Sequence, residues 1–215
     1  MNLEIIMELA NKKVNFIGDS ITEGAGASEK ALCYVQRFAA MTGAQVRNYG
    51  IGGTRFARRR EPHENPRFDL DFCGRYAQMD DDADIIVVFG GTNDYGHGDA
   101  PLGQMGDRSV WSFYGACHTL FSGLIEKYPD KTIVVMTPMH RTSELDKDPP
   151  LRDFVYAERE VAEFYSIPVL DLWSNLGISA RVPVQKELYF KDNVHPNDAG
   201  HEKIAYTLKR FLENM

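Results

Sequence analysis

The sequence predicts an α/β protein in which helices cover both faces of a parallel β-sheet. Short apolar segments alternate with longer amphipathic segments, which is typical of β-α-β units with right-handed crossovers. The apolar segments are continuous runs of Val, Ile and Phe, as expected for strands that are buried on both faces. We treat residues 1–215 as a single domain, because this length suffices for one well-buried core.

Five strands and four helices follow from this pattern. The expected strands are 14–17, 46–49, 85–89, 133–137 and 169–170. Apolar residues at spacings of three and four, which share one helical face, predict helices over 113–124, 154–164 and 204–212. A fourth helix is expected over 31–41. The Met and aromatic residues on these helices are expected to form core rather than a cofactor site.

Composition excludes several classes of function. A net charge of −7 argues against a general nucleic-acid binder, which needs a basic surface. The three cysteines are far apart and suggest buried free thiols rather than disulfides or a zinc site; they are Cys33, Cys73 and Cys117. The N-terminal segment lacks the apolar core of a signal peptide, and no stretch has the ~20 apolar residues of a membrane span. We therefore expect a cytoplasmic protein without a membrane partner; the oligomeric state stays open.

Two long irregular segments, 54–72 and 95–108, each follow the end of a strand, and segment 140–150 follows the fourth strand. Because the carboxyl ends of parallel strands meet at one edge of the sheet, these loops should overhang a shared site. They carry many charged residues, such as Arg55 and the run 58–60. Such a run is usually a solvated face; alternatively, one arginine lines the pocket and favours a polar or anionic substrate.

Ser20 in the sequence GDSITEG lies where the first strand ends and a helix begins. Reacting groups collect at this edge in open α/β sheets. By itself, however, the Gly-Asp-Ser sequence is equally explained as a helix cap beside a tight turn. A second interpretation, a loop that cradles phosphate with the hydroxyls of Ser20 and Thr22, would make the protein a binding module. Asp19 and Glu23 argue against phosphate, which two carboxylates repel.

Three later segments provide partners for Ser20. Asp192 and His195 lie three residues apart in the sequence DNVHPND, and such a pair can take a proton from a serine hydroxyl and orient the imidazole. Backbone amides of the NYGIGGTR turn after the second strand can stabilise an oxyanion, as can the amide side chain of Asn93 in FGGTND after the third strand. Each of these segments alone could also be a cap or a turn.

In this order, the four motifs resemble those of the SGNH (GDSL-like) hydrolase superfamily, and the resemblance spans residues 18–196. It implies a flavodoxin-like three-layer α/β/α sandwich with strand order 2-1-3-4-5. Ser20 then matches the nucleophile, and Asp192 and His195 complete its triad. The oxyanion donors would be Ser20, Asn93 and Gly53, with the adjacent Gly52 as the alternative to Gly53. Ile21 stands where the common motif has Leu.

The resemblance implies an esterase that needs no cofactor. We expect it to act on short acyl groups, with acetyl favoured, on a polar alcohol or a carbohydrate, because the loops are polar and no long apolar lid is present. Lysophospholipases and thioesterases of the same superfamily are the alternatives, and a non-catalytic phosphate- or sugar-binding module is the alternative from another class. Residues beside the motifs are expected to contact substrate; these are Asp19, Gly52, Thr92, Asp94 and His97.

A metal site is not expected, although Asp192, His195, Asp198 and His201 are close in sequence. His201 follows on a helix and should point away from His195, and neither a His-x-x-x-His pair nor a cysteine partner is present. The other histidines are expected at the surface or at the rim of the site; these are His63, His97, His118 and His140.

Overall fold

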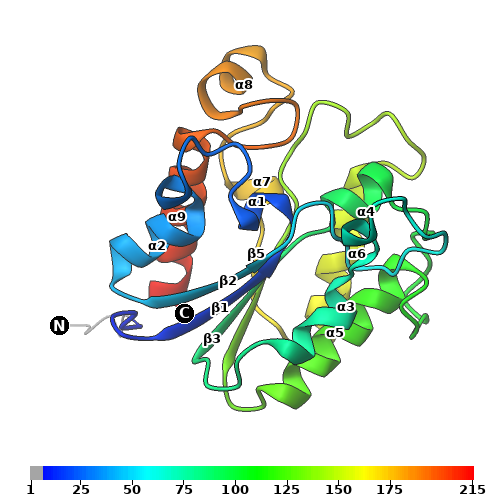
Figure 1. Cartoon of the computed structure of the whole chain (residues 1–215), viewed down its shortest axis with the longest axis horizontal. Helices are drawn as coiled ribbons and strands as arrows, with labels where there is room; N and C mark the ends of the chain where they lie inside the picture. The colour runs from blue at the N-terminus through cyan, green and yellow to red at the C-terminus, as the bar shows by residue number, and fades with distance from the viewer. Residues whose placement is uncertain (1–6) are drawn as a thin grey trace.

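The computed structural model describes residues 7–215, which form a five-stranded sheet between two layers of helices (Figure 1). The strands are β1 (Lys13–Gly18), β2 (Gln45–Gly50), β3 (Ile85–Phe89), β4 (Thr132–Met136) and β5 (Val169–Leu170). All are parallel, in the order β2-β1-β3-β4-β5. The predicted fold class and strand order are therefore confirmed, and every strand lies within one residue of its predicted position. The first six residues of the N-terminal segment lie outside the described part of the chain.

Helices α2 and α9 cover one face of the sheet, and α3, α5 and α6 cover the other (Figure 1). The longer helices are α2 (Tyr34–Thr42), α5 (Phe113–Lys127), α6 (Leu151–Phe164) and α9 (Asp198–Glu213). The shorter ones are α1 (Ser20–Glu23), α3 (Phe72–Arg75), α4 (Thr92–His97), α7 (Leu172–Asn175) and α8 (Pro183–Tyr189). Three 3₁₀ turns complete the described elements: η1 (Lys30–Leu32), η2 (Pro66–Asp69) and η3 (Tyr76–Gln78).

Strand β3 shows why the apolar runs lack alternation. Ile85, Val87 and Phe89 belong to the apolar cluster under α2 and α9, whereas Ile86 and Val88 belong to the cluster under α5 and α6. Successive side chains point to opposite faces of a strand, so both faces of this one are core. Each fully buried Val, Ile or Phe contributes about 1.5–3 kcal/mol.

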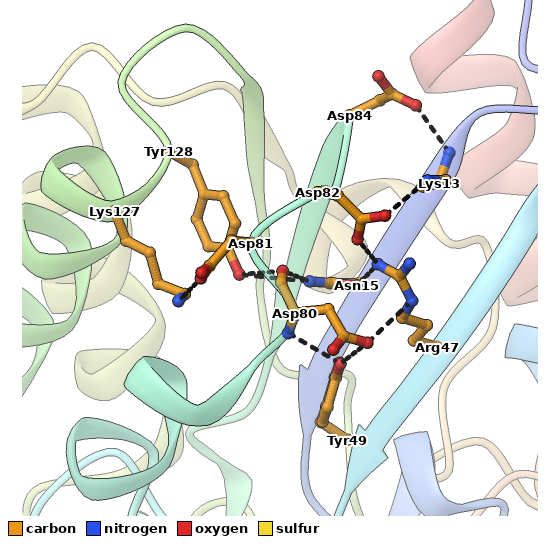
Figure 2. A network of polar contacts seen from close by, with 10 residues as sticks. All are labelled: Lys13, Asn15, Arg47, Tyr49, Asp80, Asp81, Asp82, Asp84, Lys127 and Tyr128. Atoms are coloured by element: carbon orange, nitrogen blue, oxygen red, sulfur yellow. Dashed lines mark hydrogen bonds and ion pairs between the residues drawn. The ribbon is translucent and has the colours of Figure 1, made fainter.

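A polar network joins the segment before β3 to β1, β2 and the end of α5 (Figure 2). Arg47 contacts Asp80 at 3.0 Å and Asp82 at 2.7 Å, and Lys13 contacts Asp82 at 2.5 Å. Asn15 donates to the Asp80 carbonyl at 2.8 Å. The hydrogen bonds from Lys13 and Arg47 lower the pKa of Asp82 to about 2. Exposed ion pairs contribute little singly, so we assign this network to fixing the position of the segment that enters β3.

The structure corrects several details of the sequence predictions. Helix α2 begins at Tyr34 rather than at residue 31, because Cys33 has an extended backbone (ψ 153°) after the 3₁₀ turn. Phe164 is the last apolar residue of the predicted helix 154–164 and is expected on its buried face, but it is 58% exposed at the end of α6. Segment 95–108 begins inside α4, and segment 54–72 contains η2. Cys33 and Cys117 are buried free thiols, whereas Cys73 is only half-buried.

His118 is a further correction, since it is buried rather than at the surface. Its ring nitrogens lie 3.1 Å from the Tyr165 hydroxyl and 3.1 Å from the Met105 carbonyl oxygen, so it links α5 to two loops. His63 lies at the rim, as expected, and lines the cavity described below. His140 is half-buried and its ring lies 3.9 Å from that of Trp173.

Candidate active site

Ser20 lies at the first position of α1, directly after β1, at the carboxyl edge of the sheet. The turn is tight: a Cβ atom on Gly18 would lie 2.0 Å from Oγ1 of Thr22. The Asp19 carboxylate caps α1 by accepting the backbone N–H of Ile21 at 2.9 Å. The glycine and the cap together aim the first residue of the helix away from the strand, which presents the Ser20 side chain at the edge.

The Ser20 hydroxyl, the His195 imidazole and the Asp192 carboxylate are hydrogen-bonded in series. Oγ of Ser20 lies 2.9 Å from Nε2 of His195, and Nδ1 of His195 lies 2.8 Å from Oδ2 of Asp192. Oδ1 of Asp192 accepts the backbone N–H groups of Val194 and His195, both at 2.7 Å. Partial burial acts to raise the pKa of Asp192, but these hydrogen bonds outweigh it and hold the pKa below its usual value. An ionised Asp192 fixes the ring so that Nε2 can accept a proton from Ser20.

The loop that carries His195 rests on a glycine that the sequence analysis did not single out. Gly26 has φ +92°, and a Cβ atom there would lie 2.0 Å from the Pro196 carbonyl oxygen and 3.1 Å from Cβ of His195. His201, one turn into α9, also fixes the segment that contains Gly26. Its ring nitrogens contact the Ala25 carbonyl oxygen at 3.1 Å and the Tyr34 N–H at 3.2 Å. Burial lowers the pKa of His201 to about 4, so the ring is neutral.

Three residues that line one cavity carry hydrogen-bond donors without a protein acceptor among residues 7–215: Ser20, Gly53 and Asn93. Among residues 7–215, the backbone N–H groups of Ser20 and Gly53 have no acceptor. The N–H of Gly52 donates to the Glu23 carboxylate at 2.8 Å. Asn93 donates one hydrogen of its amide to the Thr54 carbonyl at 3.0 Å, which leaves the other for a ligand. The sequence left Gly52 and Gly53 as alternatives, and the structure leaves Gly53 with the uncommitted N–H.

Gly53 also has a conformational reason to be glycine. Its φ is +79°, and a Cβ atom would lie 2.3 Å from Cδ1 of Phe68. The ring of Phe68 therefore packs directly on the Gly53 backbone, and Phe68 comes from the long loop 54–72. This close approach fixes the direction of the Gly53 N–H.

A cavity of about 630 Å³ opens beside Ser20. It is lined by Ser20, Ala25, Gly52, Gly53, Arg59, His63, Phe68, Asn93, Gly96, His97, Arg141, Val194 and His195. The loops after β1, β2, β3 and β4 and the loop before α9 all contribute, as the rule of the shared sheet edge predicts. Sequence analysis did not single out Ala25, Phe68, Gly96, Arg141 or Val194, although each belongs to a segment that the same rule places at this edge.

Two of the five expected substrate contacts, Gly52 and His97, line the cavity, and three do not. Asp19 is buried as the cap of α1, and burial raises its pKa to about 6. Asp94 is buried and accepts the N–H groups of Phe56 and Ala57 at 3.0 and 2.8 Å; burial raises its pKa to about 7. These carboxylates satisfy backbone donors beneath the cavity, a role that short motifs do not distinguish from ligand contact.

The third residue, Thr92, is also buried, and its carbonyl oxygen and Oγ1 accept hydrogen bonds from Nη1 of Arg141 at 3.2 and 3.3 Å. It therefore acts on the cavity through Arg141. Arg55, which the sequence placed among the rim residues, is only 1% exposed. Its Nη2 donates to the Phe68 carbonyl at 2.7 Å, and its Nη1 lies 3.5 Å from Nδ1 of His97.

Fold, site and sequence together define the chain as an ester hydrolase with a three-layer α/β/α fold. It belongs to the GDSL-like lipase/acylhydrolase family, whose sequence profile matches residues 16–203. No curated protein sequence matches the chain at a significant level. None of the helices described over residues 7–215 has the length and apolar character that crossing a membrane requires.

Solved structures share the fold over nearly the whole chain. A protein from Lactobacillus plantarum is 31% identical, with a TM-score of 0.82 over 94% of this chain and 97% of that chain. A member of the lipolytic G-D-S-L family from Veillonella parvula is 18% identical, with a TM-score of 0.67 over 95% and 100%. An acetyl xylan esterase from Geobacillus stearothermophilus is 22% identical, with a TM-score of 0.63 over 96% and 97%. At these lower identities, the last two comparisons establish the fold alone.

Proposed function

We propose that the protein is a serine esterase that removes short acyl groups, with acetyl favoured, from a polar alcohol or a carbohydrate. The observation that carries this proposal is the 2.9 Å contact between Oγ of Ser20 and Nε2 of His195, with Asp192 on the other ring nitrogen. A nucleophile, a base and a group that orients the base are the minimum set for covalent acyl transfer.

The proposed reaction has two halves. His195 takes the Ser20 proton while Oγ attacks the ester carbonyl carbon, and the carbonyl electron pair moves to oxygen. The N–H groups of Ser20 and Gly53 and the amide of Asn93 hold that oxyanion. The bond to the alcohol then breaks, and His195 returns the proton to the leaving oxygen. Water repeats the sequence on the acyl-enzyme and releases the acid and free Ser20.

The preference for a short acyl group rests on the shape and chemistry of the cavity. Its volume of about 630 Å³ is shared between both halves of an ester and its lining includes charged and imidazole side chains, among them Arg59, His63 and Arg141. A long acyl chain would need a continuous apolar channel. The structural similarity to an acetyl xylan esterase agrees with an acetyl group on a sugar, by analogy of fold.

The proposal is tested by hydrolysis of p-nitrophenyl acetate and p-nitrophenyl butyrate, with fluorophosphonate labelling alongside. We expect the wild type to be labelled and to turn over acetate faster than butyrate. Ser20→Ala should lose labelling completely and at least about 10³-fold in kcat, because the nucleophile is gone. Ser174→Ala, a change of an exposed serine in α7 that does not line the cavity, is the matched control.

A folded wild type that is neither labelled nor active would overturn the esterase. Sugar and phosphate binding would then be measured, because a non-catalytic module is the alternative from the other class. Faster turnover of butyrate and longer esters would retain the serine mechanism but replace the short-acyl preference with that of a lysophospholipase or a thioesterase.

A further inference from the structure

The cavity is basic although the protein is acidic. Its lining includes two arginines and three histidines: Arg59, Arg141, His63, His97 and His195. The lining that the structure describes contains neither Asp nor Glu, in a chain whose net charge is −7. Partial burial and the nearby guanidinium of Arg55 lower the pKa of His97 to about 4, so His97 is neutral at pH 7. The fixed positive charge of the cavity therefore comes from its arginines.

Arg141 is held in place by neutral groups. Its Nη1 donates to the carbonyl oxygen and Oγ1 of Thr92, and its Nε donates to Oγ of Ser143 at 3.1 Å. The guanidinium lies against the backbone of Gly96, where a Cβ atom would come within 2.8 Å of Nη1, and 5.6 Å from the ring centre of Tyr95. A planar group packed in this way loses little further freedom when it binds a ligand.

The charge on Arg141 is not neutralised by an ion pair. No salt bridge described over residues 7–215 includes its guanidinium, and Nη2 has no acceptor among those residues. The acidic side chains in its surroundings are those of Asp146, Asp192 and Glu144, and none of them forms an ion pair with its guanidinium among residues 7–215. From Arg141, the buried carboxylate of Glu144 accepts only the backbone N–H, and it also contacts His140 and Arg181. A half-buried, fixed guanidinium with an uncommitted donor at the wall of a cavity is suited to an anion.

Arg59 adds a second positive charge to the cavity lining. It donates from Nε to the Glu61 carbonyl at 2.6 Å and from Nη1 to the His97 carbonyl at 3.4 Å. No carboxylate in the described chain pairs with it, whereas the neighbouring Arg58 is paired with Asp71 at 2.9 Å. Arg58 thus serves the fold, and Arg59 and Arg141 are left to act on a ligand.

We propose that this cavity selects esters that carry a second, negatively charged group, a carboxylate or a phosphate, and that Arg141 binds this charged group. The inference rests on the proposed esterase function and refines its substrate class. Charge-assisted hydrogen bonds from a fixed arginine orient the anion and bring the ester carbonyl to Ser20. A neutral ester of the same size lacks this contact and should react more slowly at low concentration.

Two matched substrate pairs test the proposal and distinguish a carboxylate from a phosphate as the charged group. The first pair compares the mono-p-nitrophenyl ester of succinic acid, which has a carboxylate in its acyl half, with neutral p-nitrophenyl butyrate. The second pair compares acetyl glycerol 3-phosphate, which has a phosphate in its alcohol half, with neutral glycerol monoacetate. We expect the wild type to prefer the anionic member of one pair in kcat/KM, and Arg141→Gln to reduce that preference on the order of 10- to 100-fold, mainly through KM.

Arg210→Gln is the matched control, because Arg210 is an exposed arginine near the end of α9, at the opposite edge of the sheet. It removes the same net charge and should leave the preference unchanged. Raising the salt concentration should weaken the preference in the wild type. If the wild type prefers the neutral member of both pairs, or if Arg141→Gln slows both members equally, the proposal is wrong while the esterase function stands.

Fluorophosphonate labelling of the wild type separates this failure from failure of the esterase itself. If the wild type is neither labelled nor active, titration calorimetry with succinate and with inorganic phosphate tests Arg141 without catalysis. Binding by the wild type that is lost in Arg141→Gln would support an anion site. Equal binding, or none, in both proteins would overturn it.

Discussion

At the scale of the residue, the site depends on which polar atoms are already occupied. Gly52 and Gly53 are adjacent, yet the N–H of Gly52 is committed to Glu23. The carboxylates of Asp19 and Asp94 are occupied by backbone donors. Asn93 uses one amide hydrogen to hold itself against Thr54 and keeps the other. The residues that are free to act on a substrate are therefore those with an uncommitted donor facing the cavity.

Asn93 tests this argument for a single residue. We expect Asn93→Ala to lower kcat about 10²- to 10³-fold with little change in KM, because an oxyanion donor acts mainly in the transition state. Labelling by fluorophosphonate should slow but still reach Ser20. Asn214→Ala, at the exposed end of the chain, is the control. Unchanged kcat in a folded Asn93→Ala protein would remove Asn93 from the oxyanion site.

At the scale of the element, the site depends on how closely loops approach one another. The loop after α1 and the start of α9 are about 170 residues apart in sequence, but Ser28 contacts Asp198, the first residue of α9, through both its N–H (2.8 Å) and its hydroxyl (2.6 Å). Gly26 lies between them, with the Pro196 carbonyl where a side chain would begin. The position of His195 relative to Ser20 is therefore set by this contact between loops.

Gly26→Ala should disturb that contact. The substitution combines an unfavourable positive φ, which costs about 1–2 kcal/mol, with a clash against backbone, so His195 must shift. We expect kcat/KM for p-nitrophenyl acetate to fall at least about 10-fold, together with a lower urea midpoint.

Gly177→Ala is its matched control. Gly177 has φ +74°, but the nearest atom to an added Cβ is Nζ of Lys203 at 3.9 Å. The free energy of unfolding of this variant should fall by a similar amount because of backbone strain, and its activity should be unchanged. Equal activity in the two variants would show that Gly26 matters for stability alone.

At the scale of the whole molecule, the sheet edge carries several buried acids. Glu158 on α6 is fully buried, and neither carboxylate oxygen has a hydrogen-bond partner within residues 7–215. Burial, with Asp94 and Asp171 nearby, raises its pKa well above the ordinary value, and burial raises that of Asp94 to about 7. Such groups favour folding while protonated. Their contribution is complete below the unfolded pKa near 4 and is lost as pH rises through the folded pKa.

We therefore expect the free energy of unfolding to fall between pH 5 and pH 8. Glu158→Gln should flatten this decline, because an amide of the same shape cannot ionise, and should raise the urea midpoint at pH 8 relative to the wild type. Glu163→Gln makes the same change at an exposed position of the same helix and should not alter the slope. If urea midpoints of the wild type rise from pH 5 to pH 8, or if both variants behave alike, Glu158 is not a source of this pH dependence.

The strands were predictable because a parallel strand buried on both faces needs a continuous apolar run, as in 85–89. The position of the site at the carboxyl edge of the sheet was predictable because all the strands are parallel. The exact start of α2 and the exposure of Phe164 did not follow, because both depend on the local backbone and on where a neighbouring layer ends. His118 was misplaced for a related reason: its two partners come from segments distant in sequence.

The sequence by itself determined the fold class, the strand positions and the four motifs that nominate Ser20, Asn93, Asp192 and His195. These features are local or periodic, so they can be predicted from a single sequence. Only the tertiary structure decided that Gly53 rather than Gly52 has the uncommitted N–H, that Asp19 and Asp94 serve the fold, and that Arg141 reaches the cavity. Those outcomes depend on which partners arrive from elsewhere, because a polar group that is satisfied by the protein is no longer available to a substrate.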